Sequence, residues 1–438
     1  MMKKIVVLGA GESGIGAALL AKKNKYDVFV SDIGKITEKS VLSNNGIRWE
    51  EGTHTKQEIL SASEVIKSPG ISDSVNIIKE LKLNGIPIIS EVEFAFRYTN
   101  SKIIAITGSN GKTTTTLLLG HILKKAGYDV LVAGNIGTGF SRSIVDRDYD
   151  FIILELSSFQ LDGIKKFKAD VSILLNITPD HLDRYENDFE KYIQSKFRIT
   201  KNQKSEDVLI YNYDDENIKN RIETKAKKIP FSLYKTFDEG AFYKDEKINI
   251  NINKNKMTIQ ELALQGKHNV YNSMAAAVAS RVLEVKDFIT RQSLLDFQNI
   301  EHRLEHVINV HGIQFINDSK ATNINSVWYA LESMHKNTVW IVGGVDKGND
   351  YSELLDLVKE RVKAIVCIGQ NTKNIHKVFE GHVDEIVDAK TMNEAVAFSY
   401  QLAKKGDAVL LSPACASFDM FSNFEERGLE FKKSVRSL

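Results

Sequence analysis

The chain has 438 residues, which is more than one ordinary hydrophobic core holds, so two to three domains are expected. Its 42% hydrophobic and 26% charged residues are typical of globular proteins, and no run of about 18 apolar residues predicts a membrane span. A formal net charge of +1 argues against a broad electrostatic surface for nucleic acid, while a local basic pocket is still allowed. Two cysteines, Cys367 and Cys415, cannot build a disulfide framework, so a reducing, cytoplasmic setting is expected.

The first domain is expected to begin with a strand, a glycine loop and a helix. Residues 4–8 are apolar, residues 9–16 read GAGESGIG, and a second strand over residues 26–30 leads to Asp32. A G-x-G-x-x-G pattern with an acidic residue about 20 positions on is the fingerprint of a dinucleotide site. Gly9, Gly11, Gly14 and Asp32 by themselves therefore favour NAD(P).

Two more strands are expected in this domain, at residues 64–67 and 86–89. Ser68-Pro69-Gly70 follows the first of them, and open α/β sheets bind their ligands at such strand ends. The domain is expected to end between residues 93 and 101.

The second domain is expected to open with a phosphate-binding loop. Residues 107–115 read TGSNGKTTT and lie between the apolar run 102–106 and the helical stretch 117–123. In such a loop the glycines let backbone N–H groups face an anion at a helix N-terminus, the lysine binds the β- and γ-phosphates, and the following hydroxyl binds Mg²⁺. Residue 106 is Ile, so the loop is shorter than the common G-x-x-x-x-G-K-[ST] form. An ATP site is therefore predicted at Gly108, Ser109, Asn110, Gly111, Lys112, Thr113 and Thr114.

Strands and helices alternate along the rest of the chain, which predicts parallel sheets covered on both faces. In the second domain, strands are expected at residues 129–132, 150–154, 171–175 and 208–211, followed by an exposed, two-faced β-meander over residues 225–258. In the third, they are expected at residues 314–316, 339–342, 364–368, 385–387 and 408–411. The predicted fold class is α/β with three domains: a Rossmann-like domain at residues 1–95, a central ATP-binding domain at 96–299 and a second Rossmann-like domain at 300–438.

Three further residues attract attention by their chemistry. Glu155 ends an apolar run beside the phosphate loop, where a carboxylate is a natural Mg²⁺ ligand. His181 also follows an apolar strand, but its spacing alone favours a hydrogen-bonded structural histidine over a metal ligand. Lys196, taken alone, is expected to be a solvent-facing lysine of a helix.

In their order along the chain, these motifs resemble the ATP-dependent Mur ligases of peptidoglycan synthesis, over essentially the whole sequence. Residues 107–115 are similar to the short phosphate loop of that family, which accounts for the missing first glycine. The resemblance implies that Glu155 and His181 bind Mg²⁺ together with Thr113, and that Lys196 is carbamylated, so that it carries a carboxylate that supports the metal. The candidate catalytic residues are Lys112, His181 and Lys196.

Three stretches resemble the members of the family that add D-glutamate: ELSSFQ at residues 155–160, NDSKATN at 317–323 and SPACASFDMFSNFEERG at 412–428. The implied reaction uses ATP to join UDP-N-acetylmuramoyl-L-alanine to D-glutamate through an acyl phosphate. The implied partners are small molecules only, and a monomer is expected.

The resemblance also implies where ATP is held outside the phosphate loop. It assigns Asn269 to the adenine side, and Arg303, Asp318 and Lys320 to contacts from the third domain. That domain is then expected to close on ATP. From the residues alone, Asn269 could equally cap a helix, and Asp318 with Lys320 could be a solvated pair.

The implied substrate contacts fall in the first and third domains, with two in the central domain. In the first domain the resemblance implies that the glycine loop binds the uridine diphosphate of the sugar substrate and not NAD(P). The negative charge of Glu12 beside a diphosphate is unfavourable unless its carboxylate points away. The implied contacts of the UDP-sugar are Ser13, Asp32, Gly70, Asn135 and Gln160. Those of D-glutamate are Thr322, Lys347, Ser417, Phe418 and Phe424. Phe418 stands where a smaller aliphatic residue is expected in many relatives.

Three other functions remain open at this point. Another Mur-type or folylpolyglutamate ligase would share Lys112, Glu155 and His181 but differ in the run 412–428. An NAD-dependent oxidoreductase would use the first glycine loop and leave Lys112 without a role. A catalytically silent nucleotide-binding scaffold would not need Lys112, Glu155, His181 and Lys196.

Overall fold

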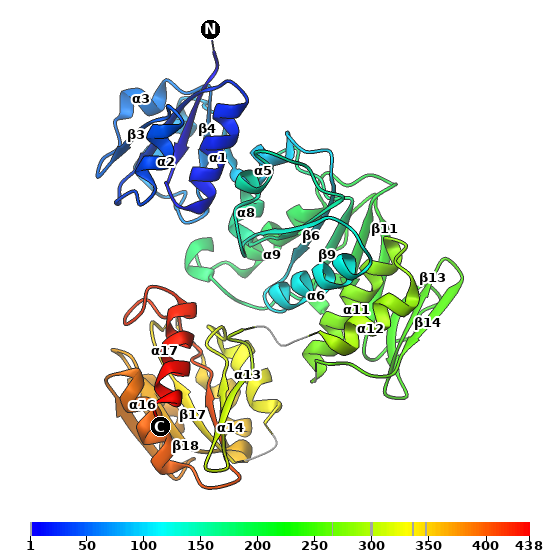
Figure 1. Cartoon of the computed structure of the whole chain (residues 1–438), viewed down its shortest axis with the longest axis vertical. Coiled ribbons are helices and arrows are strands. Elements are labelled where there is room, and N and C mark those ends of the chain that lie inside the picture. Colours follow the sequence, from blue (N-terminus) through cyan, green and yellow to red (C-terminus); the bar gives the residue numbers. More distant parts are fainter. Residues whose placement is uncertain (1, 265, 298–300, 335–336, 347) are drawn as a thin grey trace. The chain divides into compact units, whose positions relative to one another are not determined.

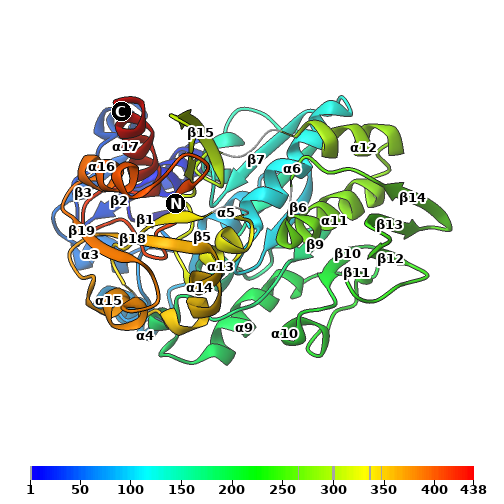
Figure 2. The same cartoon turned by 90° about the horizontal axis from the view of Figure 1, so that it is seen from below.

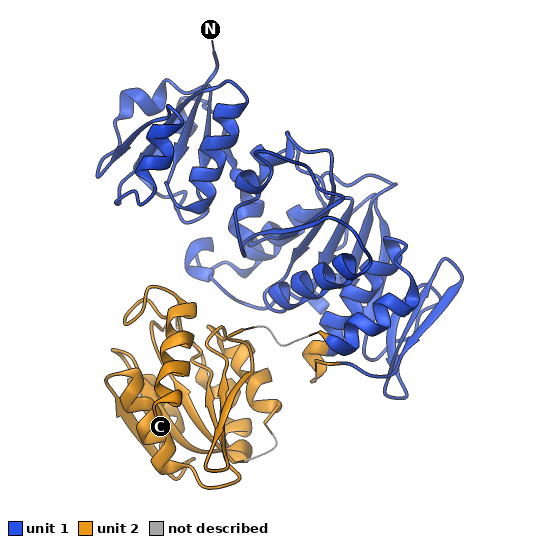
Figure 3. Cartoon of the chain, in the orientation of Figure 1, with its two compact units in different colours: residues 1–262, 270–296 blue, residues 263–269, 297–438 orange. Residues whose placement is uncertain are grey.

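The computed structural model describes residues 2–264, 266–297, 301–334, 337–346 and 348–438, which form three separate β-sheets flanked by helices (Figure 1). The chain divides into two compact units (Figure 3): residues 1–262 with 270–296, and residues 263–269 with 297–438. The first unit contains two of the sheets and the second unit contains the third. The predicted α/β class with three sheet-containing parts is confirmed, while the domain bounds 1–95, 96–299 and 300–438 stay a prediction.

The first sheet is fully parallel, and its strand order β3-β2-β1-β4-β5 is that of a doubly wound fold without the sixth strand. Its strands are β1 (Lys4–Leu8), β2 (Asp27–Asp32), β3 (Arg48–Glu51), β4 (Glu64–Lys67) and β5 (Ile88–Ser90). Its helices are α1 (Glu12–Lys23), α2 (Lys39–Asn44), α3 (Lys56–Leu60), α4 (Asn76–Leu83) and α5 (Glu91–Phe96). The sequence did not predict β3, because this edge strand reads RWEE and none of its residues is fully buried.

The second sheet has nine strands in the order β14-β13-β12-β11-β10-β9-β6-β8-β7. They are β6 (Lys102–Thr107), β7 (Val130–Gly134), β8 (Phe151–Glu155), β9 (Val171–Leu174), β10 (Val208–Asn212), β11 (Lys227–Ser232), β12 (Gly240–Lys244), β13 (Lys247–Ile252) and β14 (Asn255–Ile259). The helices are α6 (Lys112–Lys125), α7 (Phe140–Ser143), α8 (Ser158–Asp162), η1 (Leu182–Tyr185), α9 (Phe189–Phe197), η2 (Arg198–Thr200), α10 (Glu216–Lys219), α11 (Lys267–Val282) and α12 (Asp287–Asp296). Helices α6, α11 and α12 lie together on one face (Figures 1 and 2), and Asp296 of α12 bonds His121 of α6 at 2.9 Å.

The predicted meander is only partly correct. Strands β12, β13 and β14 are antiparallel neighbours, but β11 pairs in parallel with β10 and so belongs to the main sheet. The expectation of two different faces is confirmed for β13, because Ile248, Ile250 and Ile252 are buried while the asparagines between them are only partly buried. Their alternation with asparagines marks one buried face, as expected for a strand with a period of two.

The third sheet has the order β15-β16-β20-β17-β18-β19 and is parallel except for β15, which is antiparallel to β16. Its strands are β15 (Glu305–Val310), β16 (Ile313–Asn317), β17 (Thr338–Val342), β18 (Val362–Ile368), β19 (Glu385–Ala389) and β20 (Ala408–Leu411). Its helices are α13 (Ile324–Glu332), η3 (Tyr351–Leu354), α14 (Leu355–Arg361), α15 (Lys373–Phe379), α16 (Met392–Leu402) and α17 (Phe424–Arg436).

One hydrophobic cluster runs from the first sheet into the second. It includes Ile5 of β1, Phe94 of α5, Phe140 of α7 and Ile152 of β8, all of which are buried. This shared core explains why the first two predicted domains form a single compact unit. Both cysteines are free and buried, and no helix of the described residues has the length and apolar character needed to cross a membrane.

Candidate active site

The predicted phosphate loop lies between β6 and α6, as expected. Helix α6 begins at Lys112, directly after Gly111, whose φ of 84° is in the left-handed region that favours glycine. A Cβ atom on Gly111 would also lie 2.2 Å from Oδ1 of Asn272, so a side chain does not fit. The loop thus brings its backbone to a helix N-terminus, the geometry that suits an anion.

Side chains fix this loop to the segment that follows β9. Ser109 Oγ donates to the carbonyl of Thr178 at 2.8 Å and accepts from the Thr178 N–H at 2.9 Å. Asn110 and Asn176 exchange two further hydrogen bonds, of 2.8 and 3.0 Å. Sequence reasoning missed Asn176, although an amide directly after a buried strand beside the loop was a signal for it.

The charged and hydroxyl groups of the loop converge on its mouth. Lys112 Nζ donates to the carbonyls of Gly108 and Ser109 at 2.8 and 2.9 Å. Thr113 Oγ1 donates to Glu155 Oε2 at 2.7 Å, and Glu155 is buried. A hydroxyl and a carboxylate side by side are the hard oxygen donors that Mg²⁺ prefers, so the residues present fit this ion.

The neighbouring Thr114 adds an observation that favours an anion here. Its hydroxyl is buried, and it has no hydrogen-bond partner within the part of the chain that the structure describes. Because buried polar groups are nearly always bonded, such a group marks a place where a ligand can supply the partner. The loop geometry and this hydroxyl together fit a bound phosphate.

Lys196 lies in the same place, on α9. It is only 1% exposed, its Nζ donates to the Gly108 carbonyl at 2.9 Å, and Nζ lies 4.6 Å from the centre of the Tyr192 ring. Burial, and then the charge of Lys112, lower its pKa well below the usual value. The expectation from spacing alone, a solvent-facing lysine, is therefore wrong.

The position of His181 gives less support for a role in metal binding. It has a left-handed backbone, with φ of 53°, directly before η1, and its ring centre lies 5.2 Å from that of Phe159. Its Nε2 is 3.7 Å from Oδ2 of Asp180. Glu155 and His181 do not belong to any group of three His, Cys, Asp or Glu donors within 4.8 Å of one another among the described residues. The metal-binding role of His181 stays a prediction.

The first glycine loop is held together by Asp32. One carboxylate oxygen accepts from the Ala10 N–H at 2.6 Å and the other from the Gly34 N–H at 2.7 Å. Gly9 has φ of 92°, and a Cβ there would lie 2.5 Å from Ser68 Oγ. Asp32 therefore braces the loop through its side chain.

The carboxylate of Glu12 is held by helix α7 of the central domain and the residue before it. It accepts from Arg142 Nη1 at 2.9 Å and from the Gly139 N–H at 3.2 Å. Arg142 also binds Glu38 through two hydrogen bonds of 2.9 and 2.8 Å. The Glu12 carboxylate is thus paired with Arg142, which it shares with Glu38. Sequence reasoning missed Arg142 and expected only that the carboxylate points away.

The other predicted UDP-sugar contacts have local partners. Asn135 is exposed and donates to Glu155 Oε1 at 3.1 Å, while Ser13 is half-buried. Gln160 is buried and completes the capping box of α8, because its Oε1 accepts from the N–H of the N-cap residue Ser157 at 3.0 Å. Gly70 is exposed, and its carbonyl accepts from Arg184 at 3.3 Å. Contact of these residues with substrate stays a prediction.

In the second unit, Asp318 is buried at the end of β16. It accepts from the Leu304 N–H at 3.2 Å and from Ser412 Oγ at 2.8 Å. Burial raises its pKa to about 7, although the nearby charge of Arg303 opposes the rise. Lys320 Nζ lies 4.8 Å from the centre of the Phe424 ring. The alternative of a solvated Asp318–Lys320 pair is therefore wrong.

The alternative that Asn269 caps a helix is also wrong. Helix α11 begins at Lys267, so Asn269 is its third residue and not its cap. Asn269 is buried, and its N–H donates to the carbonyl of Gly266 at 3.0 Å.

The residues predicted to bind the amino acid differ in exposure. Ser417 is buried, Thr322 and Phe424 are half-buried, and Phe418 is 73% exposed. Lys347 lies outside the described residues. Phe424 is the first residue of α17, and its carbonyl accepts from Ser319 Oγ at 2.8 Å.

Arg427, which sequence reasoning did not single out, organises this part of the unit. Its buried guanidinium donates to Ser319 Oγ at 3.0 Å, to the Ser319 carbonyl at 2.9 Å and to the Cys415 carbonyl at 3.1 Å. It thereby joins the loop after β16 to the loop after β20. Its place inside the run 412–428 was the available signal.

Comparison with known proteins agrees with this architecture. Three family models match: the MurD N-terminal domain at residues 4–77, the Mur ligase middle domain at 106–280 and the Mur ligase glutamate ligase domain at 302–415. The chain belongs to the Mur ligase family.

Particular relatives match along the full length. The chain is 52% identical to the UDP-N-acetylmuramoylalanine--D-glutamate ligase of Christiangramia forsetii, over 100% of both chains. It is 42% identical to the ligase of the same name from Salinibacter ruber, over 99% of this chain and 98% of that one. Among solved structures, UDP-N-acetylmuramate-alanine ligase from Thermotoga maritima has a TM-score of 0.63 at 19% identity over 100% of both chains, which shows the shared fold.

Proposed function

We propose that this protein is an ATP-dependent ligase that joins D-glutamate to UDP-N-acetylmuramoyl-L-alanine in the synthesis of peptidoglycan precursors. The observation that carries the proposal is full-length identity of about half to ligases of that name, joined to a family model for their N-terminal domain. A cytoplasmic monomer is proposed as its working form.

The phosphate loop supports the use of ATP. Gly111 gives the loop the left-handed turn that brings its backbone to the N-terminus of α6. Lys112 can exchange its bonds to loop carbonyls for bonds to the β- and γ-phosphates. Thr113 and Glu155 would hold Mg²⁺, which supplies positive charge to the transferring phosphoryl group when it is bound. His181 and a carbamylated Lys196 are proposed as further supports of that ion.

The reaction needs activation, because a carboxylate is a poor electrophile. The terminal carboxylate oxygen of the alanyl group attacks the γ-phosphorus, the bond to the β-phosphate oxygen breaks, and ADP leaves. Lys112 stabilises the negative charge on the transferring group. The amine of D-glutamate then attacks the acyl phosphate, and the tetrahedral intermediate collapses to the amide and inorganic phosphate, while the amine proton passes to a base that is not assigned.

The substrate contacts follow the resemblance. The loop braced by Asp32, with Ser13 and Gly70, is proposed for the uridine diphosphate, and Asn135 and Gln160 for the sugar-peptide part. Thr322, Lys347, Ser417, Phe418 and Phe424 are proposed for D-glutamate, and Asn269, Arg303, Asp318 and Lys320 for ATP.

Phosphate release from the purified protein tests the proposal. Mg-ATP and UDP-N-acetylmuramoyl-L-alanine are supplied with D-glutamate, L-glutamate, L-lysine, meso-diaminopimelate or L-alanine in separate reactions. Release that requires both the nucleotide sugar and D-glutamate is expected. Release with another amino acid would keep the ligase class but refute the proposed substrate, and silence in every mixture would refute the reaction.

A further inference from the structure

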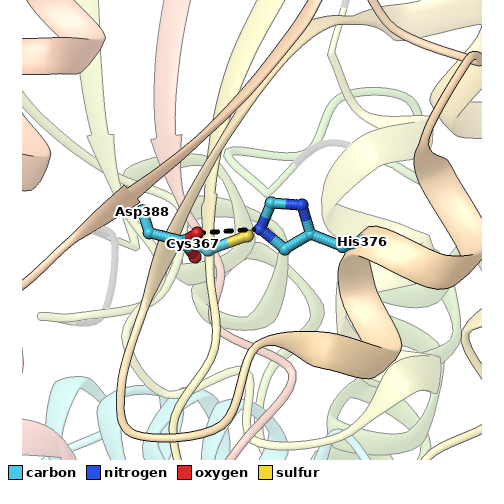
Figure 4. A group of neighbouring side chains, drawn as sticks. All are labelled: Cys367, His376 and Asp388. Carbon is cyan, nitrogen blue, oxygen red and sulfur yellow. Dashed lines mark hydrogen bonds and ion pairs between the residues drawn. The ribbon is translucent and has the colours of Figure 1, made fainter.

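Three potential metal ligands meet at one edge of the third sheet, apart from the residues proposed for catalysis (Figure 4). Cys367 on β18 and Asp388 on β19 are direct partners in the register of these two parallel strands. Residues that pair in this way present their side chains to the same face of a sheet. His376, on the short helix α15, contributes the third group.

The donor atoms of the three residues converge. His376 Nε2 lies 3.0 Å from Asp388 Oδ2, and one ligand atom from each of the three residues lies within 4.8 Å of the others. In the described ranges this is the one group of three His, Cys, Asp or Glu side chains with that property.

A bound zinc ion requires its donor atoms to stand only slightly closer together than the 4.8 Å limit that these three atoms meet. Zn²⁺ takes sulfur at about 2.3 Å and nitrogen or oxygen at about 2.0–2.2 Å, so tetrahedral donors stand roughly 3.3–3.7 Å apart. Small rotations of the two outer side chains reach that spacing. Solvent leaves room for such rotations, since the His376 side chain is 34% exposed and that of Asp388 is 57% exposed.

Two simpler explanations of this cluster, a surface ion pair and a nucleophilic cysteine, account for fewer of its features. A surface ion pair accounts for His376 and Asp388 but not for the sulfur beside them. A nucleophilic cysteine would need access and a lowered pKa, whereas Cys367 is buried, and burial and then Asp388 raise the pKa of its thiol. The mixture of a soft sulfur, an imidazole nitrogen and a carboxylate oxygen instead matches the ligand preference of a thiophilic ion.

We propose that Cys367, His376 and Asp388 form a binding site for a thiophilic divalent cation such as Zn²⁺. The thiol releases its proton to solvent as the metal–sulfur bond forms, and water completes the coordination on the exposed side. The bound ion ties α15 and the edge strand β19 to β18. This proposal does not depend on the proposed ligase reaction.

Cobalt binding tests the site, because a thiolate bound to Co²⁺ gives a charge-transfer absorption that oxygen and nitrogen ligands do not. Co²⁺ is titrated into the full-length, metal-free protein, with the thiols kept reduced. The absorption should saturate at one Co²⁺ ion per chain. Added Zn²⁺ should displace the bound Co²⁺ and remove the absorption. The Mg²⁺ site proposed above contains no cysteine, so it cannot produce this signal.

Matched variants locate the signal. The sequence has only two cysteines, so Cys367→Ser should abolish the absorption while Cys415→Ser keeps it. His376→Gln and Asp388→Asn, at partly exposed positions, should weaken cobalt binding roughly 100-fold or more, since even the loss of an outer-shell partner costs about 10- to 100-fold. Zn²⁺ should raise the thermal midpoint of the wild type but not that of His376→Gln. Absence of the absorption, its loss in Cys415→Ser alone, or unchanged affinity in both outer variants would overturn the proposal.

Discussion

Two lysines of the phosphate loop region share one acceptor. Lys112 and Lys196 both donate to the carbonyl of Gly108, at 2.8 and 2.9 Å. Two ammonium ions at one buried carbonyl would repel each other strongly, and the charge of Lys112 is one cause of the lowered pKa of Lys196. A lower pKa gives a larger neutral fraction at neutral pH, and only the neutral amine can attack CO₂.

Carbamylation of Lys196 is therefore expected and can be observed directly. With ¹³C-labelled bicarbonate, the wild-type protein should show a carbamate signal by NMR near neutral pH. Lys196→Gln should lose this signal, whereas Lys191→Gln, at a solvent-exposed position of the same helix, should keep it. An unchanged spectrum in Lys196→Gln would contradict the assignment.

Removal of the Lys112 side chain should abolish most of the activity. Loss of one group that stabilises transition-state charge costs about 10²–10³ in kcat, so Lys112→Ala should fall by roughly that factor. Phosphate release measures the effect. Lys124→Ala, exposed near the end of the same helix, is the control and should retain wild-type rates. Equal rates in both variants would exclude Lys112 from phosphoryl transfer.

The buried Glu91 should make stability depend on pH. It accepts from the Ser141 N–H, and burial raises its pKa from 4.5 to about 7. The folded state thus keeps a proton that the unfolded chain releases, so stability is lost as the pH rises from about 4.5 to 7. Glu91→Gln removes this loss and should raise the free energy of unfolding by at most about 3 kcal/mol at pH 8, with little change at pH 4.5. Urea unfolding of the wild type and the variant at pH 4.5 and pH 8 measures this difference. An equal change in the free energy of unfolding at both pH values would refute the raised pKa of Glu91.

At the scale of elements, helices α1 and α7 are held together closely at the first glycine loop. A Cβ on Gly16 of α1 would lie 2.8 Å from Cβ of Arg142 on α7, so this approach requires glycine. Arg142 then reaches Glu12 and Glu38 from α7. A cation of the central domain is thus paired with two carboxylates beside the glycine loop of the first sheet.

Loss of Arg142 should weaken binding of the nucleotide sugar. In Arg142→Ala the Glu12 carboxylate keeps its charge beside the proposed diphosphate site, and a charge at such a partly exposed site is worth on the order of 1–2 kcal/mol. The KM for UDP-N-acetylmuramoyl-L-alanine should rise roughly 5- to 30-fold, with kcat and the KM for ATP nearly unchanged. Arg147→Ala, exposed just beyond α7, should leave all three constants unaltered. A fall in kcat alone would point to a different role.

Apolar strands and the phosphate loop could be predicted because their information is local. Strands β1, β4 and β20 were predicted with their observed bounds. Strand β3, which reads RWEE, and strand β15, which is largely exposed, lack an apolar run and were missed. The burial of Lys196, the bond of Asp32 to Ala10 and the contacts of Arg427 depend on partners 12 to 108 residues away, which no local pattern encodes.

At the scale of the whole molecule, the residues assigned to ATP by resemblance belong to different units. Lys112 and Thr113 are in the first unit, and Arg303, Asp318 and Lys320 are in the second. For one ATP molecule to engage both sets, the second unit is expected to close on the first when ligands bind. Small-angle scattering should therefore show a smaller radius of gyration with a nonhydrolysable ATP analogue and the nucleotide sugar than without them. Identical scattering curves would count against closure.

The segment 263–269 has a consequence for how members of this family could exchange parts. It belongs to the second unit, where the His268 ring centre lies 4.9 Å from that of Tyr329 and Lys267 pairs with Glu332 at 3.8 Å. The chain then returns to the first unit through the rest of α11. A single recombination point near residue 297 would thus transplant the second unit without this segment. A chimaeric ligase with a foreign second unit must replace residues 263–269 as well, or restore those two contacts by matched substitutions.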